Sequence, residues 1–203
     1  GGKRAGAFEC VVPADFSTAT FFLCAAALCG REVRLRGLDL ADTQGDKAVI
    51  EYLRRMGAAI EAEKEAIVVR AAPLHGAELD LNATPDALPA LAVTACFAEG
   101  PTVLGNVPQA RQKETDRIAV MAAELTKLGA EVEELPDGLV VRSCRLRAGE
   151  VDGHGDHRVV MALAVGGLYA REPITIDTAE AIGVTFPNFV ELMTGLGAQM
   201  QTA

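Results

Sequence analysis

The densest group of reactive side chains in this sequence lies in one short segment, residues 109–117, which reads Gln-Ala-Arg-Gln-Lys-Glu-Thr-Asp-Arg. Cationic side chains bind phosphate and carboxylate groups, and a carboxyl group beside them can move a proton. Lys113, Glu114 and Arg117 therefore predict a site for an anionic substrate whose reaction needs proton transfer. Taken alone, the same segment also fits a solvated helix start with a local ion pair.

The composition of the whole chain makes this basic segment an exception. The 203 residues carry a formal net charge of −9, with a pI near 4.9. Such a surface argues against a nucleic acid or an anionic membrane as a partner. Half of the residues are hydrophobic, which is enough for a large core in one or two domains. The longest apolar runs, 18–29 and 159–170, are 12 residues each, and a bilayer span takes roughly 20.

The cysteines predict the compartment and argue against a metal. They are odd in number, without a CxxC pair: Cys10, Cys24, Cys29, Cys96 and Cys144. Four lie in apolar or strand-like runs, so we interpret them as small buried side chains in a reducing, cytoplasmic compartment. We expect no metal and no cofactor, because no His/Cys spacing suits zinc and no glycine-rich nucleotide loop follows a strand. The chain begins Gly-Gly rather than Met, so we expect it to be a piece of a longer protein.

Three similar units follow one another along the chain. Aspartates and glycines recur at intervals of about 70 residues, at Asp15, Asp86 and Asp156 and at Gly57, Gly129 and Gly197. Each glycine follows a segment with apolar residues at helical spacing, as in Ile118, Met121, Ala122, Leu125 and Leu128, or Phe186, Phe189, Val190, Met193 and Leu196. These segments predict amphipathic helices that end at a glycine in the left-handed conformation.

Each unit also contains an earlier helix-like segment that is apolar on every side. These segments are 17–28, 87–98 and 157–170, and a helix of this kind is buried on all sides. Strand-like segments at 32–38, 102–106 and Ile174–Asp177 and hairpins ending at 67–70 and 139–142 surround them. Each unit therefore reads β-α-β-α-β-β, over about 8–72, 77–144 and 149–203. Together they predict one inverted α/β barrel, or prism, with the apolar helices inside and the sheets outside.

Two consequences follow from this arrangement. The third unit lacks a closing hairpin, so we expect another chain segment to supply the missing strands. The three buried helices begin just after Asp15, Asp86 and Asp156, so parallel packing brings their N-termini to one face. There the free N–H groups and the helix dipoles favour anions.

Four motifs together resemble the enolpyruvyl transferase family, most closely its branch that acts on shikimate-3-phosphate. They are Lys-Glu-Thr-Asp-Arg at 113–117, Pro-Asp-Ala at 85–87, Gly-Asp-His-Arg at 155–158 and Thr-Phe-Pro at 185–187. Segments 12–17 and 44–46 are similar to that family as well, and the similarity runs in order along the whole chain. It implies a two-domain enzyme that closes on its substrates at the domain interface. Residues 1–203 resemble its C-terminal domain, and the partner N-terminal domain is absent from this sequence.

The resemblance implies a reaction of the shikimate pathway of aromatic amino-acid biosynthesis. The enolpyruvyl group of phosphoenolpyruvate is transferred to the 5-hydroxyl of shikimate-3-phosphate, and phosphate is released. It also implies that Asp86 orients and deprotonates the hydroxyl, that Glu114 delivers a proton to carbon, and that Lys113 lies near both. We expect this chain to be inactive alone, because the missing domain holds most contacts to the phosphate ester.

The same resemblance assigns the binding residues. It implies phosphoenolpyruvate contacts from Arg117, Arg158 and His157, and shikimate-3-phosphate contacts from Asp86, Gln109 and Lys113. Val184 departs from the pattern, since many relatives carry a phosphoenolpyruvate-binding lysine there.

Structural alternatives remain for several of these residues. Asp86 and Asp15 each fit the cap of a buried helix, and Asp116 fits a cap or an ion pair with a neighbouring arginine. Arg158 at the start of an apolar helix needs an anionic partner. His75 and His154 lie in loop-like segments, so we expect both side chains to be exposed and to have no role in the site.

Two other functions remain open from the sequence. The related UDP-N-acetylglucosamine enolpyruvyl transferases share the fold and chemistry with a different acceptor, and the chain also fits a non-catalytic module that binds anions or a partner.

Overall fold

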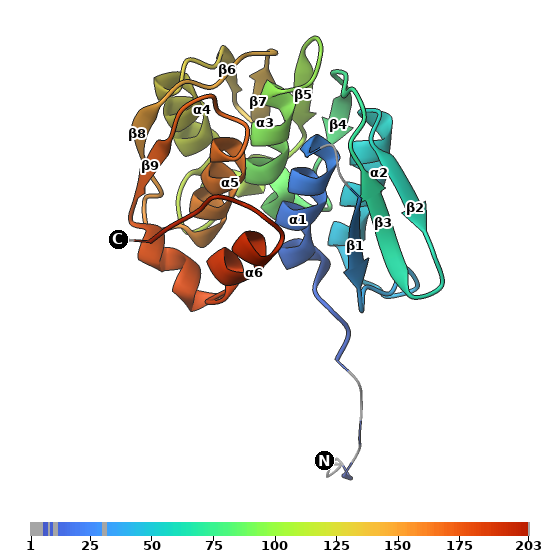
Figure 1. Ribbon diagram of the computed structural model, residues 1–203. Coiled ribbons are helices and arrows are strands. Elements are labelled where there is room, and N and C mark those ends of the chain that lie inside the picture. Colours follow the sequence, from blue (N-terminus) through green and yellow to red (C-terminus); the bar gives the residue numbers. More distant parts are fainter. Residues whose placement is uncertain (1–5, 8, 10–11, 30–31, 203) are drawn as a thin grey trace, which may run out of the picture.

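The computed structural model describes residues 6–7, 9, 12–29 and 32–202, and Cys10 lies outside these residues. Helices and short strands alternate along the chain in an α/β arrangement, with helices packed between and beside small sheets (Figure 1). None of the described helices has the length and hydrophobicity that crossing a bilayer requires.

The three apolar segments form the helices at the centre of the fold. They are α1 (Phe16–Leu28), α3 (Leu88–Cys96) and α5 (His157–Gly167), and all three pack against one another. Every residue of α3 is buried, as expected for a helix that is apolar on every side. A short 3₁₀ turn, η2 (Pro85–Ala87), precedes α3 and carries Asp86. The prediction of three buried helices is confirmed, with boundaries shifted by up to three residues.

The three amphipathic segments form α2 (Val49–Arg55), α4 (Arg117–Lys127) and α6 (Phe189–Gly195). The glycines after them have φ values of +100° at Gly57, +87° at Gly129 and +99° at Gly197, which confirms the predicted left-handed ends. The apolar face predicted for α6 is only partly buried, since Leu196 is 60% exposed. Its counterpart Leu128 is fully buried beside Gly149 at the next strand.

The strands form three sheets. The first contains β1 (Val33–Arg36), β2 (Ala59–Ala62) and β3 (Ala66–Arg70) in the antiparallel order β1-β3-β2. The second contains β4 (Glu78–Asp80), β5 (Thr102–Gly105), β6 (Val132–Leu135) and β7 (Gly138–Val141) in the order β4-β5-β7-β6. The third is the parallel pair of β8 (Gly149–Asp152) and β9 (Ile174–Asp177).

The predicted inverted α/β barrel is confirmed only as an α/β arrangement, because the described strands do not form a closed barrel. These strands lie in three separate sheets, and no ladder between described strands joins one sheet to the next. The reason is local: each hairpin, β2–β3 and β6–β7, pairs with a strand of its own unit. The helices at the centre and the sheets beside them remain as predicted (Figure 1).

The cysteine prediction is only partly confirmed. Cys24 and Cys96 are buried, whereas Cys144 is half-buried and Cys29, just after α1, is exposed. Burial raises the pKa of the Cys24 thiol to about 12, so this thiol stays protonated and unreactive at neutral pH. No disulfide joins these four cysteines.

Gly138, the first residue of β7, has no room for a side chain. A Cβ there would lie 1.9 Å from the carbonyl oxygen of Leu104 in β5. Gly138→Ala should therefore lower the free energy of unfolding by about 2 kcal/mol, measured by urea denaturation. Gly195→Ala is the matched control, because a Cβ at Gly195 meets no described atom within 4 Å. Equal stability of the two variants would contradict the packing described here.

Candidate functional site

Four segments of the chain meet around one buried guanidinium. Arg117, the first residue of α4, is 0% exposed. Glu114 lies just before this helix, Asp86 lies on η2, and Asp156 is the N-cap of α5. The sequence places these groups up to 70 residues apart, and the packing of α3, α4 and α5 brings them together.

Arg117 is held by three carboxylates. Its Nε and Nη2 donate to the two oxygens of Asp156 at 2.8 and 3.1 Å, Nη1 donates to Asp86 at 2.7 Å, and Nη2 donates to Glu114 at 2.6 Å. A buried cation is stable only when it is paired in this way. These bonds use four of the five N–H groups of the guanidinium.

Asp86 is surrounded by positive charge. Besides Arg117, Lys113 Nζ lies 3.1 Å and Arg158 Nη2 lies 3.4 Å from its carboxylate. Burial alone raises the pKa of Asp86, but the charges of Arg158, Lys113 and Arg117 outweigh it and lower this pKa below 3.8. Asp86 is therefore ionised at neutral pH. It does not cap its helix, since no described side chain caps η2 or α3, and the cap interpretation is wrong.

Asp156 is a member of this cluster to which sequence reasoning gave no role. It is fully buried, caps α5 through Arg158 N at 2.9 Å and accepts a hydrogen bond from Thr115 Oγ1 at 3.2 Å. Burial raises the pKa of Asp156, but the hydrogen bonds and charge of Arg117, with the bonds from Arg158 N and Thr115, together outweigh burial and lower this pKa below 3.8. In sequence it resembles any capping aspartate, so only the three-dimensional contact with Arg117 reveals its part in the site.

His157 lies at the edge of the cluster. Its Nδ1 is 3.9 Å from Glu114 Oε1, and its side chain is 11% exposed. Burial and the charge of Arg158 lower the pKa of His157 below 6.5, so the imidazole is neutral at pH 7.

The helix N-termini do not form the open anion site that was expected. Asp15 caps α1 by accepting from Ser17 N at 3.3 Å and Thr18 N at 2.7 Å, and Asp156 caps α5. These carboxylates accept from two N–H groups of α1 and one of α5 and bring negative charge, so these two N-termini are not open anion sites. The partly exposed cations beside the cluster are Lys113 and Arg158, whose side chains are 31% and 15% exposed.

The remaining candidates lie around this cluster or away from it. Gln109, on η3 (Pro108–Gln112), donates to the carbonyl of Asn82 at 2.7 Å. Asp116 both caps α4 and pairs with Arg111 at 2.8 Å, as the sequence suggested. Val184, on η4 (Ala179–Val184), is 82% exposed.

The two loop histidines, His75 and His154, are both exposed, as predicted. His154 also has a contact that no periodicity in the sequence could indicate, since its Nε2 lies 2.9 Å from Glu124 Oε1.

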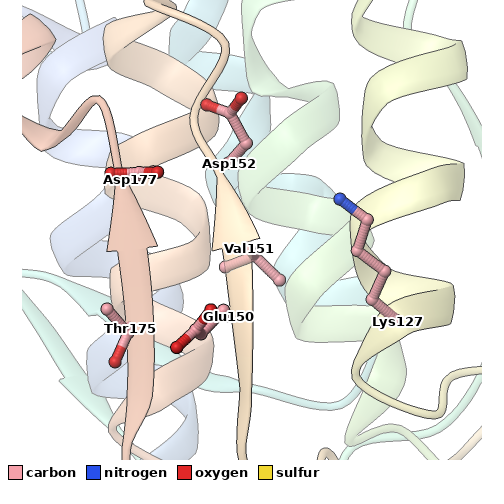
Figure 2. Close-up of a pocket in the computed structure, with 6 residues that line it drawn as sticks. All are labelled: Lys127, Glu150, Val151, Asp152, Thr175 and Asp177. Carbon is pink, nitrogen blue, oxygen red and sulfur yellow. The ribbon is translucent and has the colours of Figure 1, made fainter.

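A separate pocket of about 380 Å³ lies at the far end of α4 from Arg117 (Figure 2). It is lined by Lys127, Glu150, Val151, Asp152, Thr175 and Asp177. None of the candidate residues lines it. In the described ranges no three His, Cys, Asp or Glu side chains form a possible metal group. The candidate site is therefore the cluster around Arg117.

The sequence of this chain is similar to those of known proteins. The family model for EPSP synthase (3-phosphoshikimate 1-carboxyvinyltransferase) matches residues 1–193. A 3-phosphoshikimate 1-carboxyvinyltransferase of Ruminiclostridium cellulolyticum is 53% identical over 201 residues, which are 99% of this chain and 48% of that protein. The corresponding protein of Acetivibrio thermocellus is 52% identical over 202 residues, 100% of this chain and 48% of that protein.

The fold is also similar to a solved structure of an EPSP synthase from Acinetobacter baumannii. The TM-score is 0.82 at 33% sequence identity, and the match covers 91% of this chain and 46% of that chain. The chain thus spans about half the length of the relatives that it matches.

Proposed function

This chain belongs to the EPSP synthase (3-phosphoshikimate 1-carboxyvinyltransferase) family, and from that premise we propose that it supplies about half of an enzyme with this activity. In the proposed reaction the enolpyruvyl group of phosphoenolpyruvate moves to the 5-hydroxyl of shikimate-3-phosphate, and phosphate leaves. The observation that carries the proposal is the cluster around Arg117. It places two partly exposed cations beside carboxylates that the chemistry needs.

The reaction requires proton transfer at two places. As the hydroxyl oxygen bonds to C2 of phosphoenolpyruvate, the hydroxyl loses a proton and the methylene carbon gains one. When the C2–O bond to phosphate breaks, the new methyl group loses a proton again. We assign the orientation and deprotonation of the hydroxyl to Asp86. Its lowered pKa keeps this carboxylate ionised, so it can accept a hydrogen bond from the hydroxyl.

We assign the delivery of the proton to the methylene carbon to Glu114. The Glu114 side chain is 49% exposed, so it reaches the open side of the cluster. Its ion pair with Arg117 fixes its position. His157 lies 3.9 Å from Glu114 and is neutral, so it is suited to exchange a proton with it.

Phosphoenolpyruvate is proposed to bind at Arg158, Arg117 and His157. A guanidinium recognises a carboxylate or phosphate by two parallel hydrogen bonds. Arg117 has one N–H left after its four bonds, so Arg158 makes the main contact. Arg117 contributes charge and holds Asp86 and Glu114 in place.

Shikimate-3-phosphate is proposed to bind at Asp86, Lys113 and Gln109. Lys113 and Asp86 form an ion pair at 3.1 Å, and together they offer a donor and an acceptor to the sugar hydroxyls. The side-chain amide of Gln109 lies on the adjoining η3 turn, which packs against η2.

We propose that residues 1–203 form one domain of three β-α-β-α-β-β units, an inverted α/β prism completed by the N-terminal half of the same protein. In the second sheet β5 pairs with both β4 and β7. Its counterpart β9 has β8 as its partner among the described strands, so the other edge of β9 is open to antiparallel strands from elsewhere. The remaining partners are the two small-molecule substrates, with no nucleic acid or membrane.

Co-expression with the N-terminal half of the protein tests this function. We expect phosphate release from phosphoenolpyruvate only when shikimate-3-phosphate is present, and none from the 203-residue chain alone. Release that depends on a UDP-sugar would assign the chain to the related transferases. A folded complex without release would leave a binding module and overturn the proposal.

A further inference from the structure

Glu124 is a buried carboxylate that the proposed reaction does not use. It lies on α4, seven residues after Arg117 and therefore on the same face of the helix, and it is 1% exposed. It accepts hydrogen bonds from Lys127 Nζ at 2.8 Å, from His154 Nε2 at 2.9 Å and from the backbone N–H of Asp152 at 3.0 Å. Burying a carboxylate is costly, so three donors at one position indicate a selected arrangement.

Two of these donors belong to the turn that leads into α5. His154 has φ +52°, in the left-handed region that non-glycine residues seldom adopt. Its N–H donates to Asp152 Oδ1 at 2.7 Å, and the same oxygen accepts from Thr178 Oγ1 at 3.0 Å. Gly153 is fixed by close packing, because a Cβ there would lie 2.1 Å from Val160 Cγ2. A turn with such backbone angles keeps its shape only when its surroundings hold it.

The face of α4 thus contacts this turn at two points. Arg117 binds Asp156 at one end of the turn, and Glu124 binds His154 and Asp152 at the other. His157 and Arg158, the residues proposed to bind phosphoenolpyruvate, follow directly in the chain. We propose that Glu124 and His154 form a brace that fixes the 152–156 turn and so positions His157 and Arg158 against Glu114 and Arg117. The inference rests on the proposed function for its kinetic consequences.

The brace has a specific kinetic signature. The residues proposed to bind shikimate-3-phosphate are Asp86 on η2, Gln109 on η3 and Lys113 just after η3. None of them belongs to the 152–156 turn. Loosening the turn should therefore affect phosphoenolpyruvate and spare the other substrate. A merely structural contact would lower stability without separating the two substrates.

The test uses the enzyme completed by its N-terminal half, with His154→Ala and Glu124→Gln as the variants. We expect the KM for phosphoenolpyruvate to rise about tenfold, because small displacements of a binding group cost this much or more, with the KM for shikimate-3-phosphate within about twofold. His154→Gln should restore most of the loss, since a glutamine amide can donate from nearly the same place as Nε2. Lys127→Ala is the matched control: it also removes a donor to Glu124, but from α4 itself.

Equal changes in both KM values, no change, or no rescue by His154→Gln would overturn the brace. Hydrogen exchange of the 152–158 backbone in the 203-residue chain gives a readout that does not depend on activity. His154→Ala should speed this exchange about tenfold relative to Lys127→Ala. Faster exchange in a protein without transferase activity would support the brace and contradict the proposed function. Unchanged exchange would remove the brace itself.

Discussion

Asp86→Asn is expected to lower kcat about a thousandfold in the completed enzyme, because general acid–base groups contribute on that order. Asparagine keeps the shape of the side chain but neither takes a proton nor carries the charge that pairs with Lys113, Arg117 and Arg158. Steady-state phosphate release measures the effect, and the thermal unfolding midpoint shows whether the fold is kept.

The matched control for Asp86 is Asp15, the aspartate at the same place in the first unit. Asp15 is exposed, and its described contacts are the N-cap bonds of α1 and a hydrogen bond from Thr18 Oγ1. Asparagine keeps one acceptor oxygen and is as good an N-cap residue as aspartate. Asp15→Asn should therefore leave kcat within about twofold, since helix capping is retained. Near-normal turnover of Asp86→Asn, or an equal loss in both variants, would remove the role assigned to Asp86.

Asp156→Ala is expected to lower the free energy of unfolding by about 3 kcal/mol or more, because removing one partner of a buried ion pair leaves the other uncompensated. Asp156 is fully buried and supplies two of the four bonds to Arg117. Urea denaturation at pH 7 measures this loss. Asp156→Asn is the closer comparison, since its one amide oxygen can still accept from Arg158 N, while the charge and the second acceptor oxygen are lost.

The contribution of Asp156 also has a defined pH dependence. Its pKa is lower in the folded protein than the ordinary 3.8, so the unfolded chain binds a proton first as the pH falls. The stabilisation is complete above pH 3.8 and is lost as the pH falls through the lower, folded pKa. The difference between wild type and Asp156→Asn should shrink over that acidic range. A difference that stays constant with pH would contradict the ion pair.

Features set by local sequence were predictable. Gly57, Gly129 and Gly197 each follow an apolar helical pattern, and each adopts the left-handed conformation that the pattern requires. The buried helices follow in the same way from segments without a polar face. Strand pairing was not predictable, because a barrel and three sheets use the same strands and differ only in contacts between units.

The site also combines features that local sequence predicts with features that depend on contacts between units. Lys113, Glu114 and Arg117 were found from their density in one segment, but the sequence did not show that Arg117 is nearly saturated by carboxylates. Asp15 and Asp156 have the same sequence signature, an aspartate before an apolar helix. One is an exposed cap, and the other is buried because Arg117 of a different unit reaches it.

We propose that both substrates meet at the cluster around Arg117. A crystal structure of the completed enzyme with shikimate-3-phosphate and phosphoenolpyruvate tests it most directly. We expect the 5-hydroxyl within hydrogen-bonding distance of the Asp86 carboxylate and an anionic group of phosphoenolpyruvate on Arg158, with Glu114 facing the methylene carbon. Substrates bound elsewhere, with Asp86 still paired to Lys113, Arg117 and Arg158 and in contact with neither ligand, would contradict the account.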